Sequence, residues 1–466
     1  MSTVDNGLIQ LHLGVGSFHR AHQAVYMQNL HDNGDDSWHI VGGNIRPDME
    51  DTINALKAQD GEYHLETVSP TGERHYQTIS SIKTLIDWDA KLEGLIEVAV
   101  NPNTRIISFT VTEAGYYLDE HHNLDCKLSD IKSDLAGETR CTIYGAMAAL
   151  LSARMQNNSG PITLQNCDNL RSNGHRFYNG LVQYLKLSGD AELLEWVGNN
   201  TSAPDSMVDR ITPRPTPEVI ARVSGVVGKI DQAALMGETF IQWVVEDNFI
   251  AGRPKWEDVG VEMVKDVMPY EEAKIRLLNA THSCIAWAGT LRGYQFIHEG
   301  AQDPEIRQLA YDYVTQDVMP CLDSEENPSP LNLADYRDVV LDRFSNPNVE
   351  DTNQRVVMDG YSKIPGFILP TISEALEAGR SIDAVAILPA LFLAFIRIQQ
   401  RGELAYTYQD AAMPADNPQR YCGAEDSILS FASEQLLFGQ LAGNAKLIEA
   451  LRLAEERVNS FITAKL

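Results

Sequence analysis

The chain has 466 residues, enough for about three domain-sized units or for two larger domains. Its composition, with 44% hydrophobic and 22% charged residues, is that of a globular protein and excludes the disordered and fibrous classes. The net charge of −28 repels nucleic-acid phosphates and anionic membrane surfaces, so we expect neither as a partner, whereas a small neutral substrate is unaffected.

The cysteines and the apolar segments predict where the protein works. Six cysteines are scattered along the chain without a C-x-x-C pair, which is typical of reduced cytosolic thiols. Residues 1–10 lack the apolar segment of a signal peptide. The longest apolar run, 384–396, is shorter than the about 20 residues that cross a bilayer. We therefore expect a cytoplasmic protein.

The N-terminal part alternates strand-like with helix-like segments. The expected strands are 8–13, 38–45, 63–68, 104–111 and 161–167, and the expected helices between them are 21–32, 49–59 and 142–156. The segment 104–111 (TRIISFTV) is a continuous run rich in β-branched residues, as expected of a strand buried on both faces. This alternation predicts an α/β domain with a mostly parallel sheet.

From about Asp231 onward the chain reads as mainly helical. The expected helices are 271–289, 305–318, 372–377, 384–400 and 427–461. The proline-rich stretch 212–217 is a natural break before this part. We therefore expect two domains, 1–230 with the sheet and 231–466 mainly α-helical.

The first expected strand ends in a glycine turn that resembles half of a dinucleotide-binding fingerprint. Gly14 allows a tight turn, and Gly16 lets the backbone approach a pyrophosphate. The usual third glycine is absent, and His19 stands in its place. Asp48 is the nearest carboxylate after the second strand, where a ribose ligand is expected, although it also suits a solvated helix N-cap. Arg46 stands close by and suits a 2′-phosphate, so the preference between NAD and NADP stays open.

The segment 270–283 gathers groups that are capable of proton chemistry. At about 100° per residue, Glu271, His282 and Asn279 fall within roughly 140° of Lys274 on a helix, and apolar residues share this arc. Burial would lower the pKa of Lys274 and make it a general base near neutral pH. The alternative is a surface Glu–Lys pair on an amphipathic helix.

Six motifs in chain order resemble the mannitol dehydrogenase family, the polyol-specific long-chain dehydrogenases. They are GVGSFHRAH at 14–22, TEAGYY at 112–117, CDNL at 167–170, MVDRITP at 207–213, K-x4-N-x2-H at 274–282 and RFSNP at 343–347. The missing third glycine is typical of this family. By overall similarity, 165–169 and 279–289 most resemble its D-arabinitol 4-dehydrogenase branch.

The resemblance implies an N-terminal Rossmann-type NAD-binding domain, a helical substrate domain, an active site in the cleft between them, and no metal. It implies NAD-dependent oxidation of a secondary hydroxyl of a sugar alcohol to a ketose, most closely D-arabinitol to D-xylulose. The implied cofactor contacts are Gly14, Gly16, Ser17, Phe18, Asp48, Thr112 and Glu113. For partners, we expect only the small polyol or ketose substrate, with the chain a monomer or weak oligomer.

The resemblance also implies roles for the remaining polar residues. Lys274 is the base, and Asn169 and Asn279 donate hydrogen bonds to the developing alkoxide. His282 orients a neighbouring hydroxyl, and Glu271 connects the base to solvent. Asp209 and Arg343 are expected to be substrate residues, although Arg343 also suits a structural salt bridge.

Several alternatives stay open at this point. The same scaffold also suits mannitol 2-dehydrogenase or a fructuronate or tagaturonate reductase, and a uronate would need a cation for its carboxylate. A nucleotide-sugar epimerase or another short-chain enzyme would use a Tyr-x3-Lys pair, which occurs here as Tyr270 and Lys274. A non-enzymatic NAD-binding regulator would keep the glycine turn alone. A metal site at His19 and His22 or at His121 and His122 lacks a third ligand at a sensible spacing.

Overall fold

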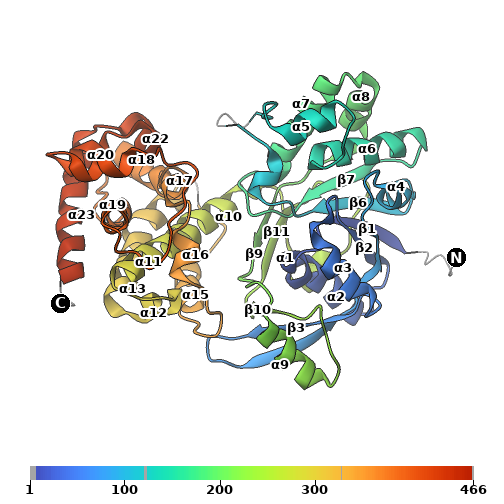
Figure 1. Cartoon of the computed structure of the whole chain (residues 1–466), viewed down its shortest axis with the longest axis horizontal. Helices are drawn as coiled ribbons and strands as arrows, with labels where there is room; N and C mark the ends of the chain where they lie inside the picture. Colours follow the sequence, from blue (N-terminus) through green and yellow to red (C-terminus); the bar gives the residue numbers. More distant parts are fainter. Residues whose placement is uncertain (1–6, 120–122, 327, 464–466) are drawn as a thin grey trace. The chain divides into compact units, whose positions relative to one another are not determined.

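The computed structural model describes residues 7–119, 123–326 and 328–463, which include neither His121 nor His122 (Figure 1). The chain forms two compact units, and each has its own secondary-structure class. Unit 1 comprises 1–69 and 73–268, and unit 2 comprises 70–72 and 269–466.

Unit 1 is built on a six-stranded parallel sheet of order β5-β2-β1-β6-β7-β8. The strands are β1 (Leu8–Leu13), β2 (Trp38–Gly43), β5 (Ile82–Leu85), β6 (Thr104–Phe109), β7 (Ile162–Asn166) and β8 (Thr201–Ser202). The expected α/β domain with a parallel sheet is therefore confirmed. All residues of β2 and β7 are buried, as expected for strands that are covered on both faces.

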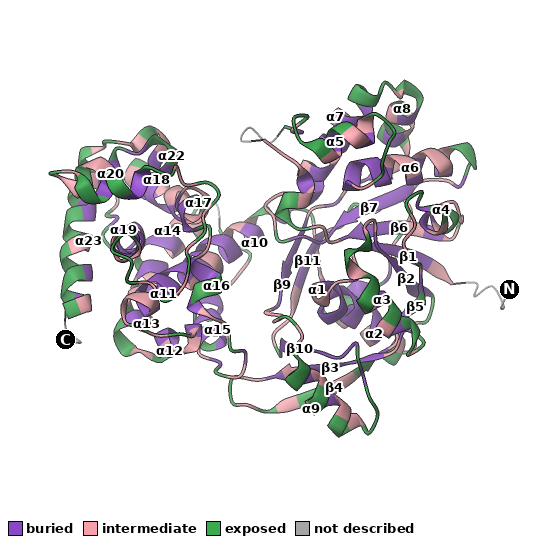
Figure 2. Ribbon diagram, in the orientation of Figure 1, coloured by how far each residue is buried: buried purple, intermediate pink, exposed green. Residues whose placement is uncertain are grey.

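Helices pack on both faces of this sheet, and two clusters of buried residues join the sheet to them. Figure 2 shows the buried parts of these strands and helices in purple. One cluster joins Leu11 and Phe109 to α4 (Glu93–Ala99), α6 (Ile143–Gln156) and α7 (Asn173–Ser188). The other joins Ile40 and Ile106 to α1 (Ser17–Ala21), α2 (Gln23–Asp32) and α3 (Glu50–Lys57). The sheet is thus the middle of three layers, and the loops after β1, β2, β6 and β7 gather at its carboxyl edge.

Two small sheets extend unit 1 beyond the expected boundary at residue 230. The sheet β10-β3-β4 contains β3 (Tyr63–Val68), β4 (Arg74–Ile79) and β10 (Leu235–Glu238). The sheet β12-β11-β9 contains β9 (Ser206–Asp209), β11 (Gln242–Glu246) and β12 (Glu262–Val264). The stretch 231–268, which we expected in the helical domain, therefore belongs to unit 1. Its strands are three to five residues long, too short to show a period in the sequence.

Unit 2 is mainly helical, as expected. Its central helix α11 (Ala280–Leu291) contacts α12 (Ile297–Gln302), α16 (Asn353–Val357) and α19 (Ile387–Gln400). All residues from Ile387 to Ile396 are buried, in a helix that covers most of the stretch expected to be helical at 384–400. Among the described residues, no helix has both the length and the hydrophobicity that crossing a membrane requires.

Several expected helices of unit 2 are divided in the structure. The expected helix 427–461 is three helices, α21 (Ser427–Ala432), α22 (Gln435–Phe438) and α23 (Ala445–Thr463). Gly439 and Gly443, both at positive φ, turn the chain between α22 and α23. The expected helix 271–289 begins in α10 (Met268–Ala273), continues as the π-helix η4 (Lys274–Asn279) and ends in α11.

Candidate active site

A pocket of about 800 Å³ lies at the carboxyl edge of the parallel sheet of unit 1. Its walls come from the glycine turn after β1, the segment after β2, the loop after β6 and the loop after β7. They include every residue expected to bind the cofactor, namely Gly14, Gly16, Ser17, Phe18, Asp48, Thr112 and Glu113. Asn169 also lines the pocket. In open α/β sheets this edge is where ligands bind.

The glycine turn has a geometry that admits no side chain at its first position. Gly14 has φ of +102°, and a Cβ there would lie 2.5 Å from the carbonyl oxygen of Thr110. The N–H of Val15 donates to the Asn44 side chain at 2.9 Å, so the turn is tied to the end of β2. The backbone is thereby fixed where it faces the pocket.

His19 takes the place of the third glycine by stacking. Its ring lies on the ring of His12 in β1, with centroids 3.4 Å apart and planes 11° from parallel. Both rings are fully buried, and burial lowers the pKa of His12 to about 3 and the pKa of His19 well below its usual value. Two neutral flat rings thus provide the contact between helix and strand for which the usual fingerprint uses glycine.

Asp168, which the sequence analysis did not single out, holds the loop after β6. Its carboxylate accepts the backbone N–H groups of Val111 and Thr112, each at 2.9 Å, and the hydroxyl of Tyr116 at 3.2 Å. Thr112 has φ of +65°, an unfavourable conformation for a β-branched residue that these bonds help to maintain. Burial raises the pKa of Asp168 to about 6 despite these donors. Asp168 therefore fixes the loop next to Asn169.

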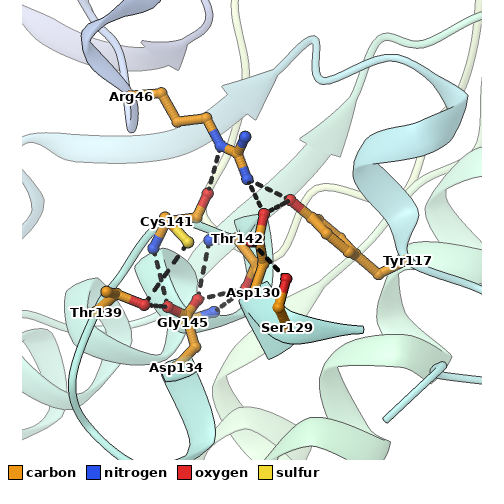
Figure 3. A network of polar contacts seen from close by, with 9 residues as sticks. All are labelled: Arg46, Tyr117, Ser129, Asp130, Asp134, Thr139, Cys141, Thr142 and Gly145. Carbon is orange, nitrogen blue, oxygen red and sulfur yellow. Dashed lines mark hydrogen bonds and ion pairs between the residues drawn. The ribbon is translucent and has the colours of Figure 1, made fainter. Parts of the chain in front are cut away.

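The segment after β2 carries both residues that bear on cofactor choice. Asp48 lies in a short 3-10 helix, η1 (Pro47–Met49), and is exposed. Arg46, not Asp48, occupies the N-cap position of that helix. The Arg46 guanidinium contacts the Asp130 carboxylate at 2.6 Å (Figure 3).

Lys274 and Glu271 are buried in unit 2, at 5% and 4% exposure, which contradicts the alternative of a surface Glu–Lys pair. Lys274 is the first residue of η4, where the N–H of Ala280 donates to the carbonyl of Ile275, five residues back. In such a turn residues five apart are one turn apart, so Asn279 lies closer to the face of Lys274 than the 100° spacing predicts. Single π turns occur frequently at functional sites.

The π turn is held by neighbouring side chains of unit 2. The Tyr313 hydroxyl donates to the carbonyl of Arg276 at 2.9 Å, and both residues are buried. The Arg276 guanidinium forms a bidentate pair with the Glu374 carboxylate, with hydrogen bonds of 2.6 and 2.7 Å, and donates a third of 2.8 Å to Glu272. Tyr313 itself begins a second π-helix, η5 (Tyr313–Val318), which contacts η4.

His282 belongs to a charged cluster that the sequence analysis missed. Its Nε2 lies 3.1 Å from Asp351, and its ring stacks on Phe344 with centroids 4.4 Å apart. Burial lowers the pKa of His282, and Asp351 opposes this change. Arg355 donates two hydrogen bonds of 2.6 Å to the Asp351 carboxylate. Burial lowers the pKa of Lys363, a further charged residue of this region, to about 8. Asp351, Arg355 and Lys363 lie outside the motifs of the sequence analysis, so no local signal pointed to them.

The two residues expected to contact substrate, Asp209 and Arg343, are both buried. Asp209 ends β9 in unit 1 and does not line the pocket described above. Arg343 lies in α15 (Leu333–Phe344), one residue before the ring that stacks on His282. Of the histidines that were weighed as metal ligands, His19 stacks on His12 and His22 contacts the carbonyl of Gln242 at 2.8 Å. Within 7–119, 123–326 and 328–463, no three His, Cys, Asp or Glu side chains are grouped for a metal.

Two family models cover nearly the whole chain. The mannitol dehydrogenase Rossmann domain matches 9–258, and the mannitol dehydrogenase C-terminal domain matches 266–459. The chain belongs to the mannitol dehydrogenase family. This membership excludes the short-chain enzymes and epimerases, for which the Tyr270–Lys274 spacing was considered. The two matched ranges also agree with a boundary near Met268.

Relatives within the mannitol dehydrogenase family align over the full chain. D-arabinitol 4-dehydrogenase of Ralstonia nicotianae is 54% identical over 100% of this chain and 99% of its own length. The enzyme of the same name from Klebsiella pneumoniae is 51% identical over 96% of this chain and 98% of its own. The solved structure of Pseudomonas fluorescens mannitol 2-dehydrogenase, a ternary complex with NAD and D-mannitol, is 32% identical with a TM-score of 0.83, covering 99% and 94%.

Proposed function

We propose that this enzyme oxidises D-arabinitol to D-xylulose with NAD. The observation that carries the proposal is the full-length identity of 54% and 51% to two D-arabinitol 4-dehydrogenases, against 32% to a mannitol 2-dehydrogenase of the same family. A non-enzymatic regulator would not need Lys274, Asn279 and His282 together on one helical stretch.

The pocket of unit 1 suits NAD in size and chemistry. The glycine turn at Gly14 and Gly16 exposes backbone where a pyrophosphate would lie, and the exposed Asp48 carboxylate suits the ribose hydroxyls. Ser17, Phe18, Thr112 and Glu113 would complete the contacts. Bound NAD supplies the nicotinamide that accepts the hydride from the substrate carbon. We assign these seven residues to the cofactor.

Lys274 is the general base in this proposal. As a neutral amine it removes the proton from the secondary hydroxyl that is oxidised, and its buried position keeps water from competing for it. Glu271, buried one helical turn earlier in α10, passes this proton towards solvent. The base and its relay thus come from consecutive turns of one helical stretch.

Asn169 and Asn279 stabilise the charge that develops on the substrate oxygen. Each offers a neutral amide N–H donor, which cannot act as the base but favours the alkoxide. Asp168 fixes the backbone next to Asn169, and η4 places Asn279 one π turn from Lys274. His282, held by Asp351, orients a neighbouring hydroxyl, and Asp209 and Arg343 complete the substrate contacts.

We also propose that the enzyme works in the cytoplasm as a monomer or weak oligomer. All six cysteines are free thiols in the structure, and two of them, Cys126 and Cys422, are exposed. Exposed thiols of this kind are typical of proteins from reducing compartments. A neutral polyol is the only partner that this function requires.

A polyol panel tests the proposal. Initial rates with D-arabinitol, xylitol, ribitol, mannitol and sorbitol are measured with NAD and with NADP by the absorbance of the reduced cofactor, and the Lys274→Ala variant serves as the background control. We expect the highest kcat/KM for D-arabinitol with NAD. A higher kcat/KM for mannitol than for D-arabinitol would overturn the substrate assignment. A higher kcat/KM for the reduction of fructuronate or tagaturonate, assayed with the reduced cofactor, would favour the uronate alternative. An absence of turnover with every substrate would support a regulator.

A further inference from the structure

Arg46 lines the cofactor pocket, as Asp48 does, but its guanidinium already donates three hydrogen bonds within the protein. Its Nε donates to the carbonyl of Cys141 at 2.9 Å. One of its terminal nitrogens donates to Asp130 at 2.6 Å and also to the hydroxyl of Tyr117. Figure 3 shows the guanidinium turned towards these three groups. An arginine after the second strand is where a 2′-phosphate is ordinarily received.

The partners of Arg46 are themselves held in place by one buried carboxylate. Asp130 lies in α5 (Ser129–Leu135), and so does Asp134, which is 5% exposed. Asp134 accepts the N–H groups of Cys141 and Thr142 at 3.0 and 2.9 Å. The carbonyl and the carboxylate that bind Arg46 thus belong to one braced unit (Figure 3). The groups that bind Arg46 are therefore held in place by contacts other than those with Arg46 itself.

The charges around Arg46 do not favour a further anion. The guanidinium carries one positive charge, and Asp130 and Asp48 each carry a negative one. The Arg46 hydrogen bond lowers the pKa of Asp130, and burial raises the pKa of Tyr117 to about 12, so the carboxylate stays ionised and the phenol stays neutral near pH 7. A 2′-phosphate at this wall would meet two carboxylates and an arginine whose Nε and one terminal nitrogen already have partners.

We propose that Asp130 is a specificity-determining residue that holds Arg46 away from the 2′ position and so makes the enzyme select NAD over NADP. This rests on the proposed use of NAD. Asp130 acts only through Arg46, so it is a positioning residue and not a ligand of the cofactor. Asp48 contributes separately, by its own charge. The pair Arg46–Asp130 is half exposed, at 41% and 40%, so its own stability is modest and the guanidinium is free to change partner once Asp130 is neutral.

The test measures equilibrium binding, without turnover. Dissociation constants for NAD, NADP and adenosine 2′,5′-bisphosphate are measured by calorimetry on the full chain and on Asp130→Asn. We expect NADP and the bisphosphate to bind about tenfold more tightly to the variant, as a newly available charge-assisted bond predicts, with NAD changed less than about twofold. Adding Arg46→Gln to Asp130→Asn should remove the gain. Tyr117→Phe, which loosens Arg46 without changing any charge, should give a smaller gain in the same direction.

Asp87→Asn is the matched control, because Asp87 pairs with Lys57 at 2.6 Å and lies in the neighbouring hollow that Arg46 also lines. It removes the same charge without touching Arg46 and should leave the NAD to NADP ratio unchanged. Equal weakening of both cofactors by Asp130→Asn would show a structural brace and overturn the proposal. A gain that survives the loss of Arg46, or that Asp87→Asn reproduces, would also overturn it. Failure of the unmodified chain to bind NAD would instead refute the proposed function.

Discussion

Replacing Asp168 with Asn tests how the loop after β6 is held. The carboxylate accepts the N–H groups of Val111 and Thr112 and the hydroxyl of Tyr116 while it is 7% exposed. Asparagine keeps the shape and one acceptor oxygen but removes the charge. We expect weaker NAD binding, because the bonds that maintain the unfavourable φ of Thr112 lose their charge-assisted character.

The effect on stability depends on pH in a defined direction. Burial raises the pKa of Asp168 to about 6 in the folded protein. The unfolded value is about 3.9, and the difference corresponds to about 3 kcal/mol at about 1.4 kcal/mol per pH unit. Between about pH 4 and pH 6 the folded form retains a proton that the unfolded form has released, so stability falls as the pH rises through this window. The amide side chain of the Asp168→Asn variant does not titrate, so the variant lacks this loss.

The assay is urea unfolding followed by tryptophan fluorescence between about pH 4 and pH 8. Five of the six tryptophans, Trp38, Trp88, Trp196, Trp243 and Trp256, lie in unit 1, so the signal reports mainly on the unit that contains Asp168. As the pH rises across this range, we expect the unmodified chain to lose about 2 to 3 kcal/mol of unfolding free energy that the variant does not lose. A difference that stays constant with pH would refute the reasoning.

Four further predictions concern the chemistry. Lys274→Ala should lose several orders of magnitude in rate and still bind NAD, and retention of more than about a tenth of the rate would show that Lys274 is not the base. Asn169→Ala and Asn279→Ala should each reduce turnover by about 10² to 10³, and the double variant should be less than multiplicatively worse if both act on one oxygen; a change in KM alone would mean that the asparagine only positions substrate. Tyr313→Phe should lower kcat more than it raises KM, because the carbonyl of Arg276 loses its donor and the π turn relaxes; a lower melting temperature with unchanged kcat would leave Tyr313 a structural role only. EDTA should leave activity intact, and loss that zinc restores would contradict a metal-independent reaction.

The sequence predicts those parts of the fold whose signals are local. The strand 8–13 and the run 104–111 were recognisable because each is a short segment rich in apolar or β-branched residues, and the glycine turn after 8–13 marks where that strand ends. The strands β10, β11 and β12 were not, because they are short and their partners lie far away in the chain, as with Leu235 and Leu65. Pairing of this kind sets the boundary at Met268, and no window of sequence contains it.

In the candidate site, too, helical spacing pointed only to residues that lie close together along the chain. Lys274, Asn279 and His282 were singled out because they share one helical segment. Their spacing around the helix was not predicted correctly, because a period of 3.6 residues was assumed where the chain forms a π turn. Asp130 lies 84 residues from Arg46, and Asp351 lies far along the chain from His282. Contacts at such separations follow from the fold and leave no pattern in the sequence.

The position of oxidation tests the central claim most directly. D-arabinitol is incubated with the enzyme and NAD until turnover is substantial, and the ketose is identified by NMR, with the Lys274→Ala variant as the control. Oxidation at one secondary hydroxyl gives D-xylulose, whereas oxidation towards the other end of the same polyol gives D-ribulose. We predict D-xylulose in amounts equal to the NADH formed. D-ribulose as the product, or NADH formation that Lys274→Ala leaves unchanged, would contradict the account.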